Sequence, residues 1–216
     1  MSLIKKLIEE GYLKTPIIIE AFREIKRSDF LPENIRKMGE GEYSLAEADE
    51  ALPIGFGQTI SQPAVVAFML ELLSPKPGEK ILDIGSGSGW TTALLSYIVS
   101  RKNEGGKVIA FELVPELAEK GNANVSKYNF IEKGVAKMFA GDGTAESFKY
   151  APFDKILASA SAKELPEAWI SQIKVNGNIV MPIGSSIWRF TKISETEVKK
   201  EEFPGFIFVP LITKDS

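Results

Sequence analysis

The chain of 216 residues contains no cysteine and no histidine. Without cysteine it cannot form a disulfide, a thiolate nucleophile or a zinc-finger framework. Without histidine it cannot use Ser-His-Asp or Cys-His catalysis, nor a histidine-ligated metal. A carboxylate-held ion such as Mg²⁺ is the only metal chemistry left, and we expect no metal site. Any chemistry must therefore rest on carboxylates, hydroxyls, amides and backbone groups.

The chain also lacks a long apolar run and a strong charge of either sign. No segment reaches the ~18 apolar residues that a membrane span requires. The first residues, MSLIKKLIEE, carry charges at helical spacing instead of a signal peptide's apolar core. We therefore expect no membrane partner and a cytoplasmic location. A net charge of −3 gives no electrostatic reason to expect a nucleic acid as partner.

Short apolar runs alternate with helical patterns from residue 63 onward. This alternation predicts βαβ units and a parallel sheet. The fold class we expect is α/β, with a doubly wound, mostly parallel central sheet and helices on both faces. The predicted strands are residues 80–84, 107–111, 135–140, 153–158 and 178–182, and the predicted helices are residues 63–73, 90–101, 115–128 and 165–173.

The two ends of the chain differ from this central pattern. Residues 3–8 and 16–26 have helical spacing and predict a helical N-terminal extension. Residues 28–62 are rich in glycine, proline and acids without a sustained period, so we expect irregular segments over a surface. At the other end, we expect two antiparallel edge strands separated by a charged stretch, namely residues 187–193 and 206–212 around residues 195–202.

The most informative segment is ILDIGSGSGW, residues 81–90, which joins a predicted strand to a predicted helix. Gly85 and Gly87 permit a tight turn close to a ligand, and Gly89 is expected to let the helix pack near the strand. The spacing differs from the G-x-G-x-x-G of dinucleotide sites. Asp83 suits a ligand with positive charge, whereas it would repel a pyrophosphate. The pattern resembles motif I of S-adenosylmethionine-dependent methyltransferases, whose ligand carries an ammonium and a sulfonium.

Two further acids follow later strands. Glu112 closes the strand 107–111, where a carboxylate can accept hydrogen bonds from both ribose hydroxyls. Asp142 lies between two glycines just past the strand 135–140 and can accept from an adenine amino group. Structural alternatives are an N-cap or a loop-bracing acid for Asp83, a surface carboxylate for Glu112 and an Asx-turn for Asp142. Their joint position at the carboxyl ends of successive strands favours one shared ligand site.

Hydrogen-bonding groups concentrate in GFGQTISQP, residues 55–63. Ser61 or Gln62 can cap the next helix, with Pro63 at its first position, but capping does not account for the preceding glycines, Gln58 and Thr59. The run resembles the signature that precedes motif I in protein-L-isoaspartate O-methyltransferases. The resemblance covers nearly the whole chain and includes SDFLP (28–32), APFD (151–154), MPIG (181–184) and FVPL (208–211).

This resemblance implies a Rossmann-like methyltransferase fold and a repair enzyme. It would transfer a methyl group from S-adenosylmethionine to the α-carboxylate of L-isoaspartyl residues in proteins and peptides, and the ester would then collapse to a succinimide. We assign Ser61 the role of orienting the acceptor carboxylate, with Thr59 in support. The predicted cofactor-binding residues are Gln58, Asp83, Gly85, Ser86, Gly87, Gly89, Glu112, Leu113, Asp142 and Gly143.

Elementary chemistry agrees with this assignment. A carboxylate with a pKa near ~4 is already ionised at pH 7 and needs no general base. We therefore expect no general-base inflection near pH ~6.5 in the methylation rate. A serine nucleophile is disfavoured because the chain offers no base to activate it.

The expected organisation is one domain, possessing a substrate-side N-terminal part (1–62), a cofactor-binding core (63–184) and C-terminal strands (185–216). A monomer is the expected oligomeric state. Other functions stay open: methylation of another acceptor such as a small molecule or RNA, and non-catalytic adenosylmethionine binding, in which Ala64 marks a lost substrate pocket. A nicotinamide oxidoreductase is disfavoured by the glycine spacing.

Overall fold

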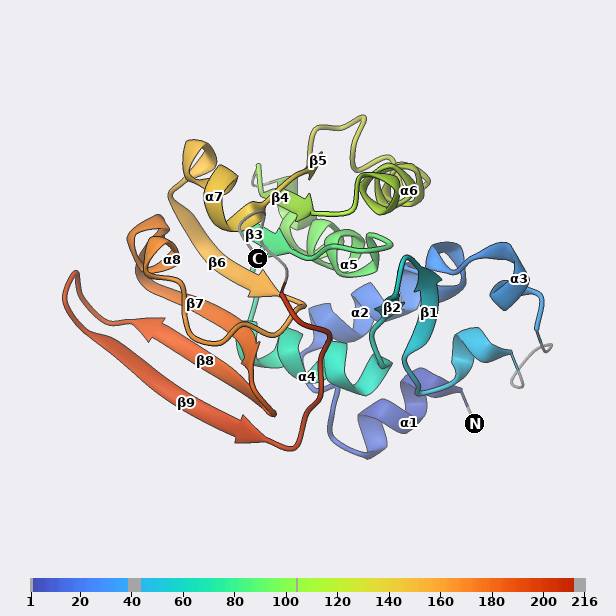
Figure 1. Ribbon diagram of the computed structural model, residues 1–216. Helices are drawn as coiled ribbons and strands as arrows, with labels where there is room; N and C mark the ends of the chain where they lie inside the picture. Colours follow the sequence, from blue (N-terminus) through green and yellow to red (C-terminus); the bar gives the residue numbers. More distant parts are fainter. Residues whose placement is uncertain (1, 39–43, 104, 212–216) are drawn as a thin grey trace.

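The structure is a computed structural model that describes residues 2–38, 44–103 and 105–211 (Figure 1). Its centre is a seven-stranded sheet in the order β5-β4-β3-β6-β7-β8-β9. Neighbouring strands from β5 to β7 are parallel, and β7, β8 and β9 are antiparallel. The predicted doubly wound, mostly parallel sheet is confirmed. The strands are β3 (Lys80–Ile84), β4 (Lys107–Glu112), β5 (Ala136–Ala140), β6 (Phe153–Ala158), β7 (Ile173–Ile183), β8 (Ser186–Lys192) and β9 (Val198–Pro204).

Helices cover both faces of this sheet. One face carries α4 (Pro63–Leu73), α5 (Trp90–Val99) and α6 (Pro115–Ser126), with α1 (Leu3–Glu9) and α2 (Pro16–Glu24) packed outside them. The other face carries α7 (Gly143–Glu146), the 3₁₀ helix η5 (Ser147–Tyr150) and α8 (Glu167–Gln172). The sequence patterns had not predicted α7 and η5. No helix among the described residues is long and apolar enough to span a bilayer.

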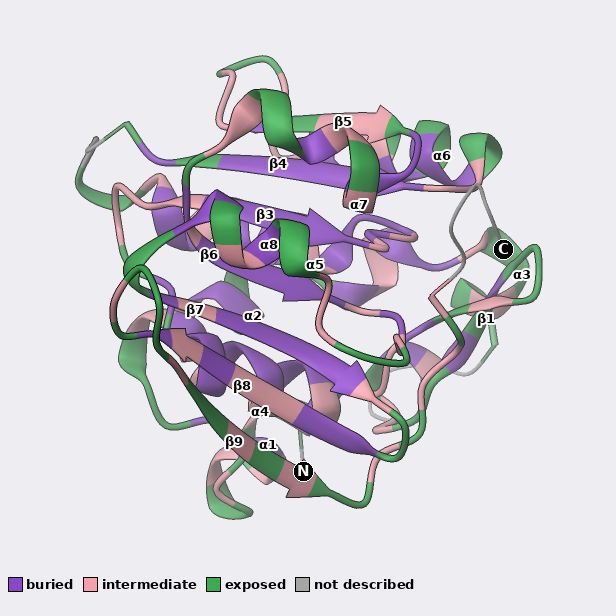
Figure 2. Cartoon of the chain, turned by 60° about the vertical axis from the view of Figure 1, so that its left-hand side comes forward, coloured by how far each residue is buried: buried purple, intermediate pink, exposed green. Residues whose placement is uncertain are grey.

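The apolar strands divide their side chains between two hydrophobic cores. Ile81 and Val108 face the core beneath α5, while Leu82 and Ile109 face the core that includes Trp169. Successive side chains of a strand point to opposite faces, so a strand buried on both sides must be apolar throughout. Figure 2 shows this burial in β3 and β4, in contrast to the largely exposed edge strand β9.

The prediction that residues 28–62 are irregular throughout is wrong. They contain the 3₁₀ helices η1 (Arg27–Phe30) and η3 (Leu45–Glu47), the short helix α3 (Glu33–Arg36), and a hairpin of β1 (Leu52–Gly55) and β2 (Gln58–Ile60). These elements span too few residues to produce a periodic pattern. Phe56 and Gly57, with φ values of 54° and 72°, form the two-residue turn that matches the twist of hairpin strands.

The C-terminal strand prediction is half right. β8 confirms the first predicted strand, but the second strand is β9, which occupies the charged stretch expected to connect them. The edge position tolerates charged side chains because an edge strand leaves them in solvent. Arg189 of β8 and Glu201 of β9 lie opposite each other, with Nη2 and Oε2 2.8 Å apart.

Residues 206–211, which we call the C-terminal strap, do not form the predicted strand; Ile212 lies outside the described residues. The strap makes one isolated bridge, in which Ser161 N donates to Val209 O at 2.8 Å and Leu211 N donates to Ser161 O at 2.7 Å. Phe206 stacks on Phe68 of α4 with ring centroids 5.3 Å apart. In Figure 1 the chain after β9 runs back past the carboxyl ends of β7 and β6.

Candidate active site

A cavity of about 360 Å³ lies at the carboxyl ends of β3 and β4. The strand order reverses at β3, which lies between β4 and β6, and doubly wound sheets bind ligands at such a switch point. The walls include residues 58–62, Val65 and Val66 of α4, the glycine loop and the start of α5, the end of β4, Gly141–Gly143, Ser159 and Ala160 after β6, and the C-terminal strap. All predicted site residues line this cavity except Asp83 and Gly89.

The glycine loop after β3 is held by the end of β4. Gly85 N and Ser86 N donate to the carbonyl of Phe111 at 2.9 and 3.1 Å. Gly85 and Gly87 have φ values of 73° and 52°, a region that L side chains rarely adopt, so glycine allows the chain to turn here. The Ser86 hydroxyl is buried, faces the cavity wall and has no hydrogen-bond partner among the described residues. A buried hydroxyl of this kind is suited to a polar ligand group.

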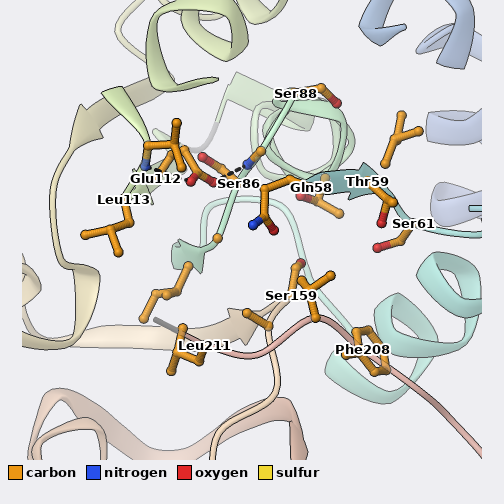
Figure 3. Close-up of a pocket in the computed structure, with 18 of the residues that line it drawn as sticks. Gln58, Thr59, Ser61, Ser86, Ser88, Glu112, Leu113, Ser159, Phe208 and Leu211 are labelled. Atoms are coloured by element: carbon orange, nitrogen blue, oxygen red, sulfur yellow. Dashed lines mark hydrogen bonds between the residues drawn. The ribbon is translucent and has the colours of Figure 1, made fainter. Parts of the chain in front are cut away.

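Glu112 braces the same loop from the opposite side. Its Oε2 accepts from Gly87 N at 2.8 Å, and its Oε1 accepts from Val114 N at 3.0 Å (Figure 3). The side chain is buried in the cavity wall, which argues against the surface-carboxylate alternative. Each carboxylate oxygen has further acceptor capacity, so Glu112 can still accept two ligand hydroxyls.

Asp83 and Gly89 support the glycine loop without lining the cavity. Asp83 is fully buried and its Oδ2 accepts from Thr91 and Thr92, at 3.1 and 2.7 Å. Burial raises the pKa of Asp83 to about 6, with the nearby Glu112 charge adding to the rise and the two threonine hydrogen bonds opposing it. A direct contact between Asp83 and the cofactor remains a prediction.

Gly89 serves a different packing contact from the expected one. A Cβ at this position would lie 2.8 Å from Val125 Cγ2 and 2.9 Å from Gly121 O. Both residues belong to α6, so Gly89 allows close packing of the start of α5 against α6. The expectation that Gly89 lets α5 pack near a strand is therefore wrong, because its closest neighbours belong to α6.

Asp142 and Gly143 form the wall beyond β5. Asp142 Oδ1 accepts from Thr144 N at 2.8 Å and from the Thr144 hydroxyl at 2.6 Å, so the residue caps α7 in the manner of the Asx-turn alternative. It also lines the cavity. A Cβ on Gly143 would lie 2.9 Å from Phe111 Cβ, so glycine is required for this close approach.

Ser61 and Thr59 face the cavity from the side opposite Glu112 and Leu113, with Gln58 beside them (Figure 3). The capping alternative for Ser61 does not hold, because Asp49 caps α4. Asp49 Oδ1 accepts from Ala64 N at 2.8 Å, and Oδ2 accepts from Gln62 Nε2 at 3.2 Å. The Ser61 hydroxyl makes no hydrogen bond recorded among the described residues. It is therefore available to a ligand.

Sequence reasoning missed Asp49 and the C-terminal strap as parts of this site. Phe208 and Leu211 of the strap line the cavity beside Ser159 (Figure 3). The motif FVPL lies in the strap, but its apolar side chains favour a strand on sequence alone. Pro210 lacks a backbone N–H, which is a signal against a regular strand.

These features define the class of protein. The glycine loop follows β3, Glu112 ends β4 and Asp142 follows β5. All three line one cavity at the switch point of a Rossmann-like sheet. The unpartnered Ser86 hydroxyl and the acceptor capacity of Glu112 fit a cofactor that carries amino-acid and ribose groups. This arrangement is typical of S-adenosylmethionine-dependent methyltransferases with a Rossmann-like fold.

Comparisons with known proteins give the particular family. The chain matches the family described as Protein-L-isoaspartate(D-aspartate) O-methyltransferase (PCMT) over residues 1–216. A protein-L-isoaspartate O-methyltransferase from Methanopyrus kandleri is 36% identical over 217 residues, covering 99% of this chain and 91% of the relative. One from Ignicoccus hospitalis is 37% identical over 219 residues, covering 99% and 97%. The chain belongs to the protein-L-isoaspartate O-methyltransferase family.

Solved structures agree with the fold. A Plasmodium falciparum structure, described as a beta-aspartate methyltransferase (PCMT) in complex with S-adenosyl-L-homocysteine, has a TM-score of 0.85 and covers 98% of this chain and 97% of its own. Its sequence identity is 24%, so this match supports the architecture. A second structure, described as a protein-L-isoaspartate O-methyltransferase, has a TM-score of 0.82 at 25% identity and covers 97% of this chain and 64% of its own.

Proposed function

We propose that this protein methylates the α-carboxylate of L-isoaspartyl residues in damaged proteins and peptides. The observation that carries the proposal is the placement of Ser61 and Thr59 in the same cavity as the glycine loop and Glu112. Family membership supports the choice of acceptor. The methyl ester would then collapse to a succinimide, which reopens in part to normal aspartate.

S-adenosylmethionine supplies an electrophilic methyl group on a sulfonium. The protein's own contribution is to bind and align. Ser61 donates its hydroxyl hydrogen to one oxygen of the acceptor carboxylate, and Thr59 supports it from the neighbouring strand. The acceptor is ionised at neutral pH, so no residue needs to remove a proton. Because the reaction neutralises two opposite charges, exclusion of water by apolar walls favours it.

The cavity provides such walls on the acceptor side. Val65 of α4 and Phe208 of the C-terminal strap are apolar lining residues of the same cavity as Ser61, and Leu211 extends this apolar wall. On the cofactor side we assign the ribose hydroxyls to Glu112 and the adenine amino group to Asp142. The loop from Gly85 to Gly87 lets backbone approach the amino-acid part of the cofactor, where the Ser86 hydroxyl finds the partner that it otherwise lacks.

The test is a pair of peptides that differ only in an isoaspartyl or a normal aspartyl linkage. Each is incubated with methyl-labelled S-adenosylmethionine and the protein. We expect base-labile label on the isoaspartyl peptide alone, since an ester hydrolyses in base. Equal labelling of both peptides would refute the proposed selectivity. Cofactor binding without label on either peptide would show that the acceptor is a different molecule or that the protein does not catalyse transfer.

A further inference from the structure

Arg27 of η1 is a buried cation that no sequence motif had marked. Its side chain is 6% exposed, and its guanidinium contacts backbone carbonyls instead of a carboxylate. The acceptors are Glu50 O at 2.6 Å, Ala48 O at 3.0 Å, Ser61 O at 3.3 Å, Ala46 O at 3.4 Å and Leu45 O at 3.5 Å. All of these carbonyls belong to residues 45–61, the segment that ends at the proposed acceptor-binding serine.

The other side of the same guanidinium contacts the cofactor side of the cavity. Its Cζ lies 5.5 Å from the ring centroid of Trp90, in a cation–π arrangement. Trp90 lines the cavity and is the first residue of α5, directly after the glycine loop. Phe22 packs in a T-shaped arrangement against the same ring with centroids 5.5 Å apart, so the indole has two contacts from the N-terminal segment.

The electrostatics of Arg27 are consistent with a fixed structural charge. Burial lowers the pKa of Arg27 to about 10, and the charges of Asp49 and Glu47 oppose that fall. Arg27 is therefore cationic at neutral pH. A buried charge is tolerated when several hydrogen bonds replace its water. The carbonyls of residues 45–61 provide them for the two terminal nitrogens, while Nε has no partner among the described residues.

We propose that Arg27 is a positioning residue that sets where Ser61 stands relative to the cofactor loop. This inference rests on the proposed function. Transfer of a methyl group needs the reacting atoms in line and about 3–3.5 Å apart, so a small displacement of the acceptor slows it strongly. Only a planar guanidinium can span several carbonyls and lie over an indole ring at once, whereas a lysine ammonium is a compact point charge.

The test replaces Arg27 while keeping its charge. In Arg27→Lys we expect kcat for the isoaspartyl peptide to fall by up to about tenfold, no more than when the Ser61 hydroxyl is removed, since Arg27 acts through the position of Ser61. The dissociation constant of S-adenosylhomocysteine, measured by calorimetry, should stay within about threefold, equivalent to less than ~1 kcal/mol. Rates are expressed per cofactor-binding site from the calorimetric stoichiometry, so misfolded protein does not contribute. Arg27→Gln keeps a planar amide but has only one nitrogen to donate. Its kcat should therefore fall at least as far as that of Arg27→Lys.

A matched control loosens η1 from its other side. Lys26 N donates to Tyr128 Oη at 2.9 Å, and that hydroxyl donates to Asp29 at 2.7 Å. Tyr128→Phe removes both hydrogen bonds without touching Ser61 or Trp90. We expect this variant to lose thermal stability while kcat stays at the wild-type value, which separates positioning from general destabilisation.

Three results would overturn the proposal: wild-type kcat in Arg27→Lys, an equal loss of kcat in Tyr128→Phe, or loss of S-adenosylhomocysteine binding in both Arg27 variants. The last result counts against it because a positioning residue leaves the cofactor site intact. A wild-type protein that binds S-adenosylhomocysteine but methylates no isoaspartyl peptide would instead contradict the proposed function.

Discussion

The two sides of the cavity are built differently. The cofactor side follows the carboxyl ends of β3, β4 and β5, and backbone hydrogen bonds attach the glycine loop to Phe111. The proposed acceptor side combines residues 58–62 with the C-terminal strap, parts of the chain separated by more than a hundred residues. Its hairpin forms a separate two-stranded sheet. Arg27 binds carbonyls on both sides of this hairpin, and Asp49 binds the start of the helix that follows it.

This difference has a physical consequence. An isolated two-stranded hairpin is marginal in water and depends on packing against the rest of the molecule. The hairpin here buries Leu52, Ile54 and Ile60, while its turn at Phe56 stays exposed. The cofactor side instead shares the hydrogen bonds of the central sheet. We therefore expect changes on the cofactor side to destabilise the whole fold, and changes on the acceptor side to affect mainly the reaction.

The largest expected effect contrasts one glycine on each side. Gly89→Ala would place a Cβ within 3 Å of α6 at a φ of 88°, whereas at Gly57, with a φ of 72°, nothing lies within 4 Å. We expect Gly89→Ala to lower the free energy of unfolding by roughly 3–5 kcal/mol, from overpacking plus backbone strain, and Gly57→Ala by only about 1–2 kcal/mol. Urea denaturation monitored by circular dichroism measures both. Equal losses would remove the proposed contrast.

The next effect uses the buried acid beneath the glycine loop. Because the pKa of Asp83 is raised from 3.8 in a free chain to about 6 in the fold, the folded state holds its proton more tightly. The contribution of Asp83 to stability is therefore full below pH ~4 and is lost as pH rises through ~6. Relative to Asp83→Asn, the free energy of unfolding should fall by on the order of 2–4 kcal/mol between pH 4 and 7. A difference that stays constant over this range would contradict the raised pKa.

Glu112 tests the cofactor side directly. Glu112→Ala removes the proposed ribose acceptor and leaves the N–H groups of Gly87 and Val114 without their partner. We expect the affinity for S-adenosylhomocysteine to fall by roughly 10- to 100-fold, as for a lost hydrogen bond to a charged group, ~1.5–3 kcal/mol. Calorimetry measures it, with Glu112→Gln as the control that keeps one acceptor oxygen. Unchanged affinity in the alanine variant would refute the ribose assignment.

Ser61 should show the smallest effect, confined to the reaction. Ser61→Ala should slow single-turnover methylation by about tenfold, the lower range for a hydrogen bond to a charged group, and spare cofactor binding. Rates are best compared between pH 7 and 8.5, where Asp83 is ionised. A steep rise with pH near neutrality that disappears in Ser61→Ala but persists in Asp83→Asn would indicate an activated hydroxyl. That result would contradict the orienting role.

The residues of the proposed cofactor side could be predicted from the sequence alone because their signals are local. The glycine loop, Glu112 and Asp142 each follow a strand whose apolar run is recognisable, and parallel strands bring their carboxyl ends to one edge without further information. The central sheet and its helices are confirmed for the same reason. The motif around Ser61 indicated the family, although nothing local showed what held that serine in place.

The sequence indicated Ser61 and Thr59 on the proposed acceptor side, but only the tertiary structure showed which residues hold them in place. Arg27 binds carbonyls up to 34 residues away, Asp49 caps a helix that begins 14 residues later, and the strap reaches the cavity through Ser161. The tertiary structure also explains β9, because its charged side chains are compatible with a strand only at the edge of the sheet. It likewise explains Asp83, since burial raises its pKa to about 6. Long-range contacts and desolvation leave no periodic pattern in the chain, so only the folded structure reveals them.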